Sequence, residues 1–309
     1  MTDANSHSRG RRSLGSLRRT ARLTWVEIRK LVSHKLFPAA VIITLLVTAG
    51  LGLAAKNFTE STGSTVRFSN YSLWVASAGY GLQVSALLLT ALGAMAMSSE
   101  ATGRTLNTIL ARPVRRVEFA LAKILSLLVA TIAIVATAAL AAWVVGGTVP
   151  ERRQPFSHRS EPPPRPAGFP TYDDVTDPQY PDTVIATRGE VMGEILFGFA
   201  LLVVPVLAGV SLGFLLGTLI ESSGLAVGIA VGVFMTLEAT KFIPMFEEYL
   251  GHLAFNYPMT RITTLMLEAG KGTVPQWHDA LVGVGISAIY VGVSLLVSVT
   301  VFCRRDITL

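Results

Sequence analysis

The chain has 309 residues, of which 51% are hydrophobic and 15% charged, and its mean hydropathy is +0.53. Soluble domains carry about 25% charged residues, so this composition excludes an ordinary soluble protein and indicates a membrane protein. The net charge of +6 is concentrated at the amino terminus and in short loops, where anionic lipid headgroups explain it as well as a nucleic acid would. We interpret it as membrane electrostatics and expect no nucleic-acid partner.

The sequence gives no sign of a catalytic, metal or nucleotide site. A single cysteine, Cys303, excludes an intramolecular disulfide, and the five histidines lack the spacing of metal ligands. The motif G-x-x-x-x-G-K-[ST] does not occur, so the chain has no P-loop for a nucleotide. No apolar run carries two acids or a Ser-His pair, which argues against an intramembrane protease or lipid hydrolase. We expect no enzyme activity, no cofactor and no metal in this chain.

The first predicted element is a helix at residues 14–35, after a disordered tail at residues 1–12. Six apolar residues of this helix fall within one stripe at the helical period: Leu14, Leu17, Ala21, Trp25, Ile28 and Val32. Arg18, Arg22 and Arg29 lie beside the stripe, as expected for an amphipathic helix in the membrane interface. The alternative is a solvated basic tail that only sets the topology.

Six apolar runs are each long enough to cross about 30 Å of hydrocarbon, which takes about 20 helical residues. They lie at about 37–55, 73–97, 123–147, 195–220, 224–243 and 280–302. The predicted fold class is therefore an all-α integral membrane protein with six transmembrane helices in one domain, residues 13–309. Lys and Arg are frequent before the first span, between spans two and three and in the tail, which predicts that both termini are cytoplasmic. We expect a multi-pass protein of the bacterial cell membrane.

Residues 148–190 separate the third and fourth spans and hold nine of the fifteen prolines. Proline removes backbone donors and favours an extended backbone, so we predict a polyproline-like outer loop without a packed core. The loop is either simply solvated or binds an extracytoplasmic protein.

The loop between spans two and three carries the pattern that bears most on function. Ser99 is placed to cap a short cytoplasmic helix, and Glu100 and Arg104 have the spacing of an i,i+4 ion pair. Leu106 and Leu110 give this helix an apolar face, which a simple connector would not need. The alternative is a basic loop that only fixes the topology.

This loop resembles the cytoplasmic signature of the ABC-2 type permeases, the membrane subunits of one class of ABC transporter. The residues that carry the resemblance extend into the third span: Glu100, Thr105, Leu106, Leu110, Arg112, Pro113, Arg116, Phe119 and Lys123. The tail from Phe302 to Asp306 is similar to the basic ending of many members. The layout also resembles the family over the whole chain, with an interfacial helix, six spans and a re-entrant or partly helical segment before the last span. Arg104 is a departure, because many members carry glycine there.

The resemblance implies that the loop is a coupling helix, which docks in a groove of a separate ATPase subunit that binds ATP and Mg. The implied coupling residues are Glu100, Arg104, Thr105, Leu106, Leu110, Arg112 and Pro113. The implied function is ATP-driven transport, with export as the expected direction, in a homodimer or a related heterodimer surrounded by membrane lipids. An ion-coupled secondary transporter or channel is the alternative, although it would need ionisable groups near the midplane. A membrane-embedded scaffold is a third possibility.

Two sets of glycines repeat at four-residue spacing in neighbouring spans. The fourth span carries Gly209, Gly213 and Gly217, and the fifth carries Gly224, Gly228 and Gly232. Each set lies on one helix face, where small residues let two backbones approach closely inside a membrane. We therefore predict that both faces take part in helix packing, on each other or on neighbouring helices.

Glu238 and Lys241 form the one charged pair within the fifth span. A rise of 1.5 Å per residue from Gly224 places Glu238 about 21 Å along the helix, in the outer third of the membrane. The pair is either an ion pair at the membrane boundary or a polar group on the translocation path. The polar segment that follows is expected to fold back at the outer surface.

Overall fold

The computed structural model describes residues 4–62, 69–102, 116–147, 172–176, 183–241 and 255–304. Among these residues, six helices are long and apolar enough to cross a membrane: α2 (Leu36–Thr62), α3 (Asn70–Thr102), α5 (Arg116–Gly147), α6 (Arg188–Leu219), α7 (Ser223–Thr240) and α10 (His278–Arg304). The chain is therefore an all-α membrane protein with six candidate spanning helices, as the apolar runs predict. Most of these helices extend beyond the predicted spans by several polar residues, because a helix does not end where the hydrocarbon does.

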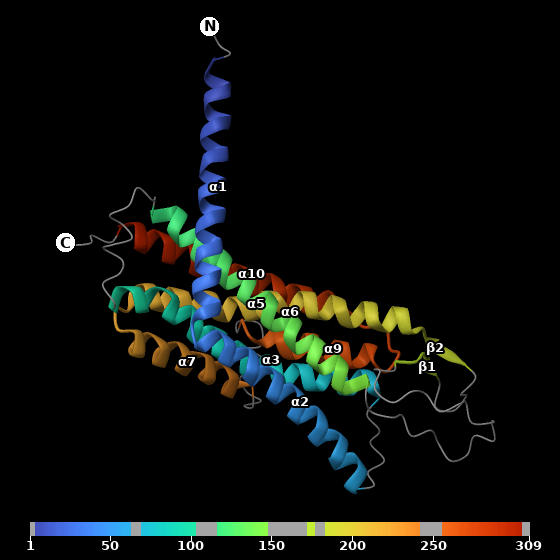
Figure 1. Ribbon diagram of the computed structural model, residues 1–309. Helices are drawn as coiled ribbons and strands as arrows, with labels where there is room; N and C mark the ends of the chain where they lie inside the picture. Colours follow the sequence, from blue (N-terminus) through green and yellow to red (C-terminus); the bar gives the residue numbers. More distant parts are fainter. Residues whose placement is uncertain are drawn as a thin grey trace.

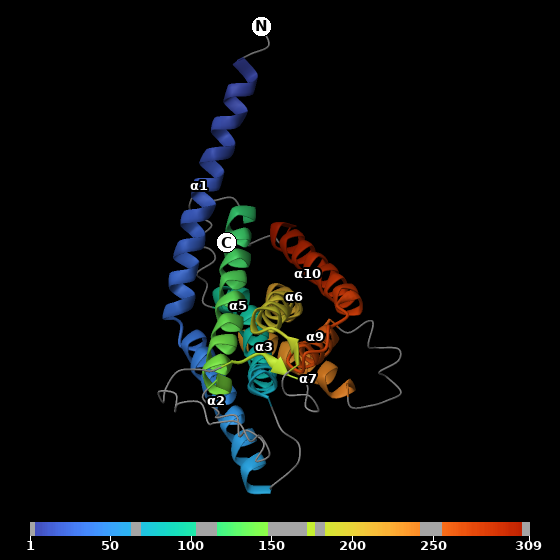
Figure 2. The same cartoon turned by 90° about the vertical axis from the view of Figure 1, so that its right-hand side faces the viewer.

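Helix α1 (Ala4–Ser33) precedes the six candidate spans. It begins ten residues before the predicted start at residue 14 and so includes most of the stretch predicted to be a disordered tail. Arginine is frequent in this stretch and favours helix. Figures 1 and 2 show α1 running across α3 and α6 rather than along them, with its amino-terminal part projecting beyond the other helices. The position of α1 in the membrane interface stays a prediction.

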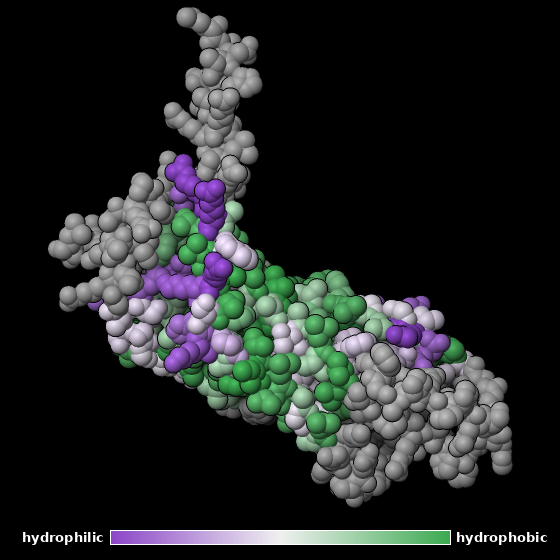
Figure 3. Space-filling view, viewed as in Figure 1, coloured by the Kyte–Doolittle hydropathy of each residue, from purple (hydrophilic) through white to green (hydrophobic). Residues whose placement is uncertain are grey.

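The bundle has two distinct ends. At one end, which we call the α1 end, α3 finishes, α5 begins and α10 finishes (Figure 1). There Arg116 Nη1 donates to the carbonyl oxygen of Cys303 at 3.1 Å, and Thr102 Oγ1 donates to that of Glu221 at 2.8 Å. The opposite end carries two short strands, β1 (Val175–Thr176) and β2 (Val184–Ala186), and we call it the sheet end. Figure 3 shows hydrophobic residues gathered between the two ends, with hydrophilic residues toward each.

Helices α3 and α6 pack backbone against backbone at the centre of the bundle. A Cβ atom at Gly213 would collide with the carbonyl oxygen of Thr90, and one at Gly217 with that of Ala94. Gly93 of α3 faces α6 in the same way, since a Cβ there would meet the carbonyl oxygen of Val210. Only glycine lets two helices approach this closely, so these positions fix the contact.

The glycines of α7 are placed differently. A Cβ atom at Gly224, Gly228 or Gly232 would have no neighbour within 4 Å among the described residues. The expectation that both sets mediate close packing therefore applies, within the described part of this chain, to α6 and not to α7. The four-residue spacing of glycines shows that a helix has a face of small residues, but it does not show which element packs on that face.

The last part of the predicted proline-rich loop is packed, which corrects the expectation that no core forms there. Tyr172 is 2% exposed and lies among the rings of Tyr71, Trp74 and Trp143 at centroid distances of 5.0, 5.4 and 6.2 Å. Its hydroxyl donates to the carbonyl oxygen of Trp143 at 2.7 Å, and burial raises the pKa of this phenol. A large aromatic side chain supplies the apolar area that the prolines around it do not.

Two further elements follow Tyr172. Strands β1 and β2 pair antiparallel, with Val175 opposite Ala186. Helix α6 then begins at Arg188, seven residues before the predicted start, because Thr187 and Glu190 form a capping box. Residues 148–171 and 177–182 lie outside the described residues, and so does the predicted polyproline conformation.

Helix α9 (Tyr257–Ala269) shows that part of the segment after α7 is helical, as expected for a re-entrant or partly helical segment, and corrects only the expectation that the segment folds back at the outer surface. Ser287 Oγ donates to the carbonyl oxygen of Phe255, just before α9, at 2.9 Å. From His278, the first residue of α10, to Ser287 is about 13.5 Å along the helix. Helix α9 then runs back beside α3 to the sheet end, where a Cβ at Gly270 would touch Tyr71. The start of α9 can lie beside Ser287, well below the sheet end, because the buried face of α9 is apolar. This face consists of Met259, Ile262, Leu265 and Met266.

Candidate functional site

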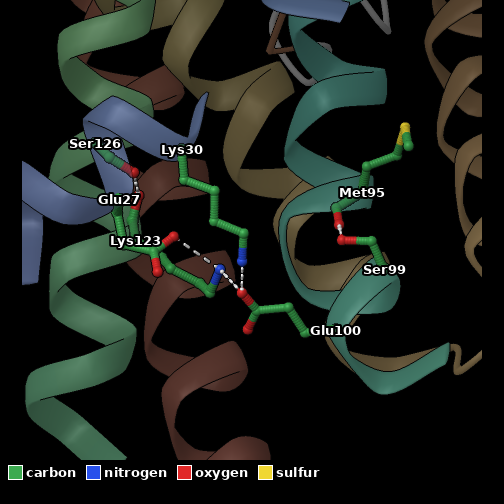
Figure 4. A network of polar contacts seen from close by, with 7 residues as sticks. All are labelled: Glu27, Lys30, Met95, Ser99, Glu100, Lys123 and Ser126. Atoms are coloured by element: carbon green, nitrogen blue, oxygen red, sulfur yellow. Dashed lines mark hydrogen bonds and ion pairs between the residues drawn. The ribbon is translucent and has the colours of Figure 1, made fainter. Parts of the chain in front are cut away.

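Four charged residues from three helices meet at the α1 end of the bundle. Lys123 of α5 places its Nζ 2.9 Å from Glu100 Oε1 of α3 and 3.0 Å from Glu27 Oε2 of α1. Lys30 of α1 pairs with the same Glu100 oxygen. Figure 4 shows these side chains converging from α1, α3 and α5. We call Glu27, Lys30, Glu100 and Lys123 the ionic cluster.

The ionic cluster is buried at its centre. The side chains of Glu100 and Lys123 are each 3% exposed, whereas that of Lys30 is 53% exposed. Two acids and two lysines balance in charge, and Lys123 Nζ also lies 5.0 Å from the centroid of the Phe119 ring, a cation–π distance. Loss of one partner from a buried ion pair leaves an uncompensated charge and costs about 3–5 kcal/mol. The cluster therefore holds the ends of α1, α3 and α5 in one arrangement.

The ionic cluster flanks the predicted coupling helix on both sides. Glu100 lies two residues before the end of α3, and Lys123 lies seven residues after the start of α5. The other predicted coupling residues lie outside the described residues: Arg104, Thr105, Leu106, Leu110, Arg112 and Pro113. The described part of the chain thus defines how this segment is anchored.

The predicted start of the coupling helix is wrong. Ser99 and Glu100 belong to α3, which continues to Thr102. Ser99 caps no new helix, because its hydroxyl donates to the carbonyl oxygen of Met95, one turn earlier, at 2.6 Å. Glu100 lies against α5 rather than on a separate helix. The i,i+4 rule considers only neighbours in sequence and cannot find a partner 23 residues away.

The surroundings of the ionic cluster leave little room for a ligand. A cavity of about 70 Å³ adjoins it, with Leu31, Leu92 and Met95 among its walls. Such a space holds a few water molecules and is too small for a nucleotide. Among the residues that the structure describes, no group of three or more His, Cys, Asp or Glu side chains could hold a metal ion.

A second polar cluster, formed by Gln83, Glu238, Lys241 and Asn256, lies between α7, α3 and the start of α9. The predicted pair is present, with Lys241 Nζ 2.9 Å from Glu238 Oε2. Asn256 Nδ2 donates to Glu238 Oε1 at 2.7 Å, and Gln83 Nε2 donates to Oε2 at 3.3 Å. The Glu238 and Lys241 side chains are 15% and 13% exposed. We call this group the α7 cluster, since it ties the end of α7 to two other elements.

The comparison with known families gives one match. Residues 41–308, which include almost all of the six candidate spans, match the family described as protein of unknown function (DUF2705). The chain belongs to this family. No curated protein matches the sequence.

In this DUF2705 protein, the long-range members of both clusters do not follow from any pattern in the sequence. Lys30 is one of many basic residues before the first span, Glu27 is an acid among them, and Gln83 and Asn256 carry no charge. One signal was available for Glu27, which is one of two acids in the otherwise basic residues 1–35. An acid in such a stretch indicates a specific partner. For Gln83 and Asn256 no signal in the sequence distinguishes them from other amides.

Proposed function

We propose that this protein is the permease subunit of an ABC transporter of the ABC-2 type, in which a separate ATPase subunit docks on the segment between α3 and α5. The observation that carries the proposal is the ionic cluster, which locks both flanks of this segment to each other and to α1. A connector that only joins two spans does not need buried charges at its two ends. Buried ion pairs at both ends hold the segment in one position relative to α1, α3 and α5, as a docking segment requires.

The packing behind the ionic cluster supports the same proposal. Force applied at the segment enters α3 and α5 together, because Glu100 and Lys123 join them. It continues into α6, because Gly213 and Gly217 hold α6 directly against the backbone of α3. Close-packed interiors transmit displacement instead of absorbing it. A movement at the α1 end would thus reach the sheet end through α6.

The remaining features of the proposal follow from the charge distribution and the resemblance. The α1 end is cytoplasmic, since the basic segments gather there, and both termini lie on that side of the cell membrane. Helix α1 lies in the membrane interface, which its transverse direction in Figure 1 supports. The partner subunit binds ATP and Mg, two permease copies form the path, and the direction of transport is export.

The test is loss of the ATPase partner on a single substitution in the docking segment. Leu106→Asp puts an unpaired carboxylate into the proposed contact, which costs about 2 kcal/mol or more and weakens association more than tenfold. The chain is expressed together with the reading frames next to its own and purified in detergent. We expect wild-type chain to carry a subunit with ATPase activity, and Leu106→Asp to lose it while eluting as a folded protein.

Val274→Asp is the matched control. Val274 is 84% exposed at the sheet end, so the same change of chemistry should leave both folding and the partner unaffected. Wild-type association and wild-type transport in Leu106→Asp would show that the segment is only a connector. Transport that persists without ATP hydrolysis but follows an ion gradient would instead favour the ion-coupled transporter.

A further inference from the structure

An apolar groove runs between α1 and α5 near the α1 end. It has a volume of about 360 Å³ and is lined almost entirely by apolar atoms. Four residues of α1 and four of α5 form its walls: Ala21, Thr24, Trp25, Ile28, Leu125, Leu128, Val129 and Ile132. The groove is open to the surface, and Trp25, Val129 and Ile132 are exposed in it.

The α5 wall of the groove lies within the first ten residues of the predicted third span, which covers about residues 123–147. Leu125 and Ile132 lie nine and sixteen residues after Arg116, the first residue of α5, or about 13 and 24 Å along the helix. The walls offer water almost no hydrogen-bond partners. A hydrocarbon chain is the occupant that fits these walls.

The face of α1 beside the groove is basic. Arg22 and Arg29 are exposed and lie two helical turns apart, on the same side of α1, with Trp25 between them in sequence. Tryptophan is enriched at the level of lipid headgroups, and arginine binds phosphate through two parallel hydrogen bonds. The acid on this part of α1, Glu27, is already paired with Lys123, so it does not offset the two arginines.

We propose that the groove between α1 and α5 binds an anionic phospholipid, with one acyl chain in the groove and the headgroup phosphate against Arg22 and Arg29. The apolar groove binds the acyl chain of the lipid. The net positive charge beside the groove favours an anionic headgroup over a zwitterionic one. The inference does not depend on the proposed transport function.

Trp25 provides a direct measurement, because bromine atoms on an acyl chain quench tryptophan at contact. The full chain in detergent is titrated with phosphatidylglycerol and with phosphatidylcholine that carry the same brominated chains. We expect saturable quenching by phosphatidylglycerol at concentrations at least tenfold lower than by phosphatidylcholine. Trp25→Phe should remove the saturable component and leave the signal from the other three tryptophans.

Two variants separate the headgroup from the chain. Arg22→Gln with Arg29→Gln should weaken phosphatidylglycerol binding about 25-fold, or about fivefold for each charge, and leave phosphatidylcholine unchanged. Val129→Phe should reduce binding of both lipids by filling the groove. The control is Arg188→Gln with Lys271→Gln, which removes two exposed charges at the sheet end and should change neither.

Three results would overturn the proposal. Equal quenching by the two lipids would mean that the groove accepts any chain without selecting a headgroup. Unsaturable quenching would mean that Trp25 only faces bulk lipid. The third result is an equal loss of phosphatidylglycerol binding in the arginine variant and the control variant, when both elute and melt like the wild-type protein. It would mean that the total charge of the protein, and not this site, attracts the lipid.

Discussion

Helices α6 and α7 carry the same glycine spacing and are both apolar, yet α6 packs closely against the bundle and α7 does so much less. In the apolar window of α6, 56% of the residues are buried inside the chain, against 17% in that of α7. The glycines of α6 lie on the backbone of α3, while those of α7 have open space beside them among the described residues. Glycine periodicity therefore makes close approach possible but does not determine which helix packs against the glycines.

Other contacts hold α7 to the bundle. Ala226 and Ala230 are buried against Ala94 of α3, and Phe234 lies 6.4 Å from Phe255, ring centroid to centroid. The α7 cluster then fixes the end of the helix through Glu238. Thus α6 is held along its length by backbone contact, and α7 by small side chains and by polar bonds at one end.

The largest effect is expected for Gly213→Leu. The new side chain would occupy the position of the Thr90 carbonyl oxygen, and a backbone cannot move aside as a flexible side chain can. Overpacking of this kind costs about 3 kcal/mol or more. Thermal unfolding in detergent should show a large fall in melting temperature or no monodisperse protein at all. A stable Gly213→Leu variant would break the assignment of α6 as the closely packed helix.

An intermediate effect is expected for Glu238→Ala. It removes the partner of Lys241 and the acceptor of Asn256 Nδ2, and a buried polar group left unpaired costs about 1–3 kcal/mol. Glu238→Gln is the matched control, because it keeps an acceptor for Asn256 and should cost less. The measurement is the melting temperature of the three proteins. Equal stability of all three would show that the α7 cluster does not hold α7 in place.

The smallest effect is expected for Gly228→Leu. A Cβ atom there has no described atom within 4 Å, so the isolated chain should change in stability by no more than about 0.5 kcal/mol. Thermal unfolding measures this, and light scattering of the same samples measures the mass of the particle. A destabilisation like that of Gly213→Leu would overturn the contrast between the two helices. A lower particle mass at unchanged melting temperature would sharpen it, because the α7 face would then pack on a second copy.

The two polar clusters show where sequence reasoning reaches its limit. Glu238 and Lys241 are three residues apart on one helix, so their pairing follows from helical geometry and was predicted. Glu100 was expected to pair with Arg104 by the same reasoning, but its described partners come from α1 and α5. Which side chain meets Glu100 depends on how α3 is rotated against α5, and no local pattern encodes that rotation.

The sequence by itself determined the features that depend on one helix at a time. The thickness of hydrocarbon requires about 20 apolar residues per span, so the run lengths gave six candidate spans, and helical geometry gave the glycine faces and the Glu238–Lys241 pair. The tertiary structure decided which of these faces meet. It packs α6 against α3 and buries Tyr172 among three rings from α3 and α5. It also places the start of α9 below the sheet end and pairs Glu100 with Lys123. Such contacts arise from the packing of several helices at once, and inside a membrane hydrophobicity no longer distinguishes one apolar face from another.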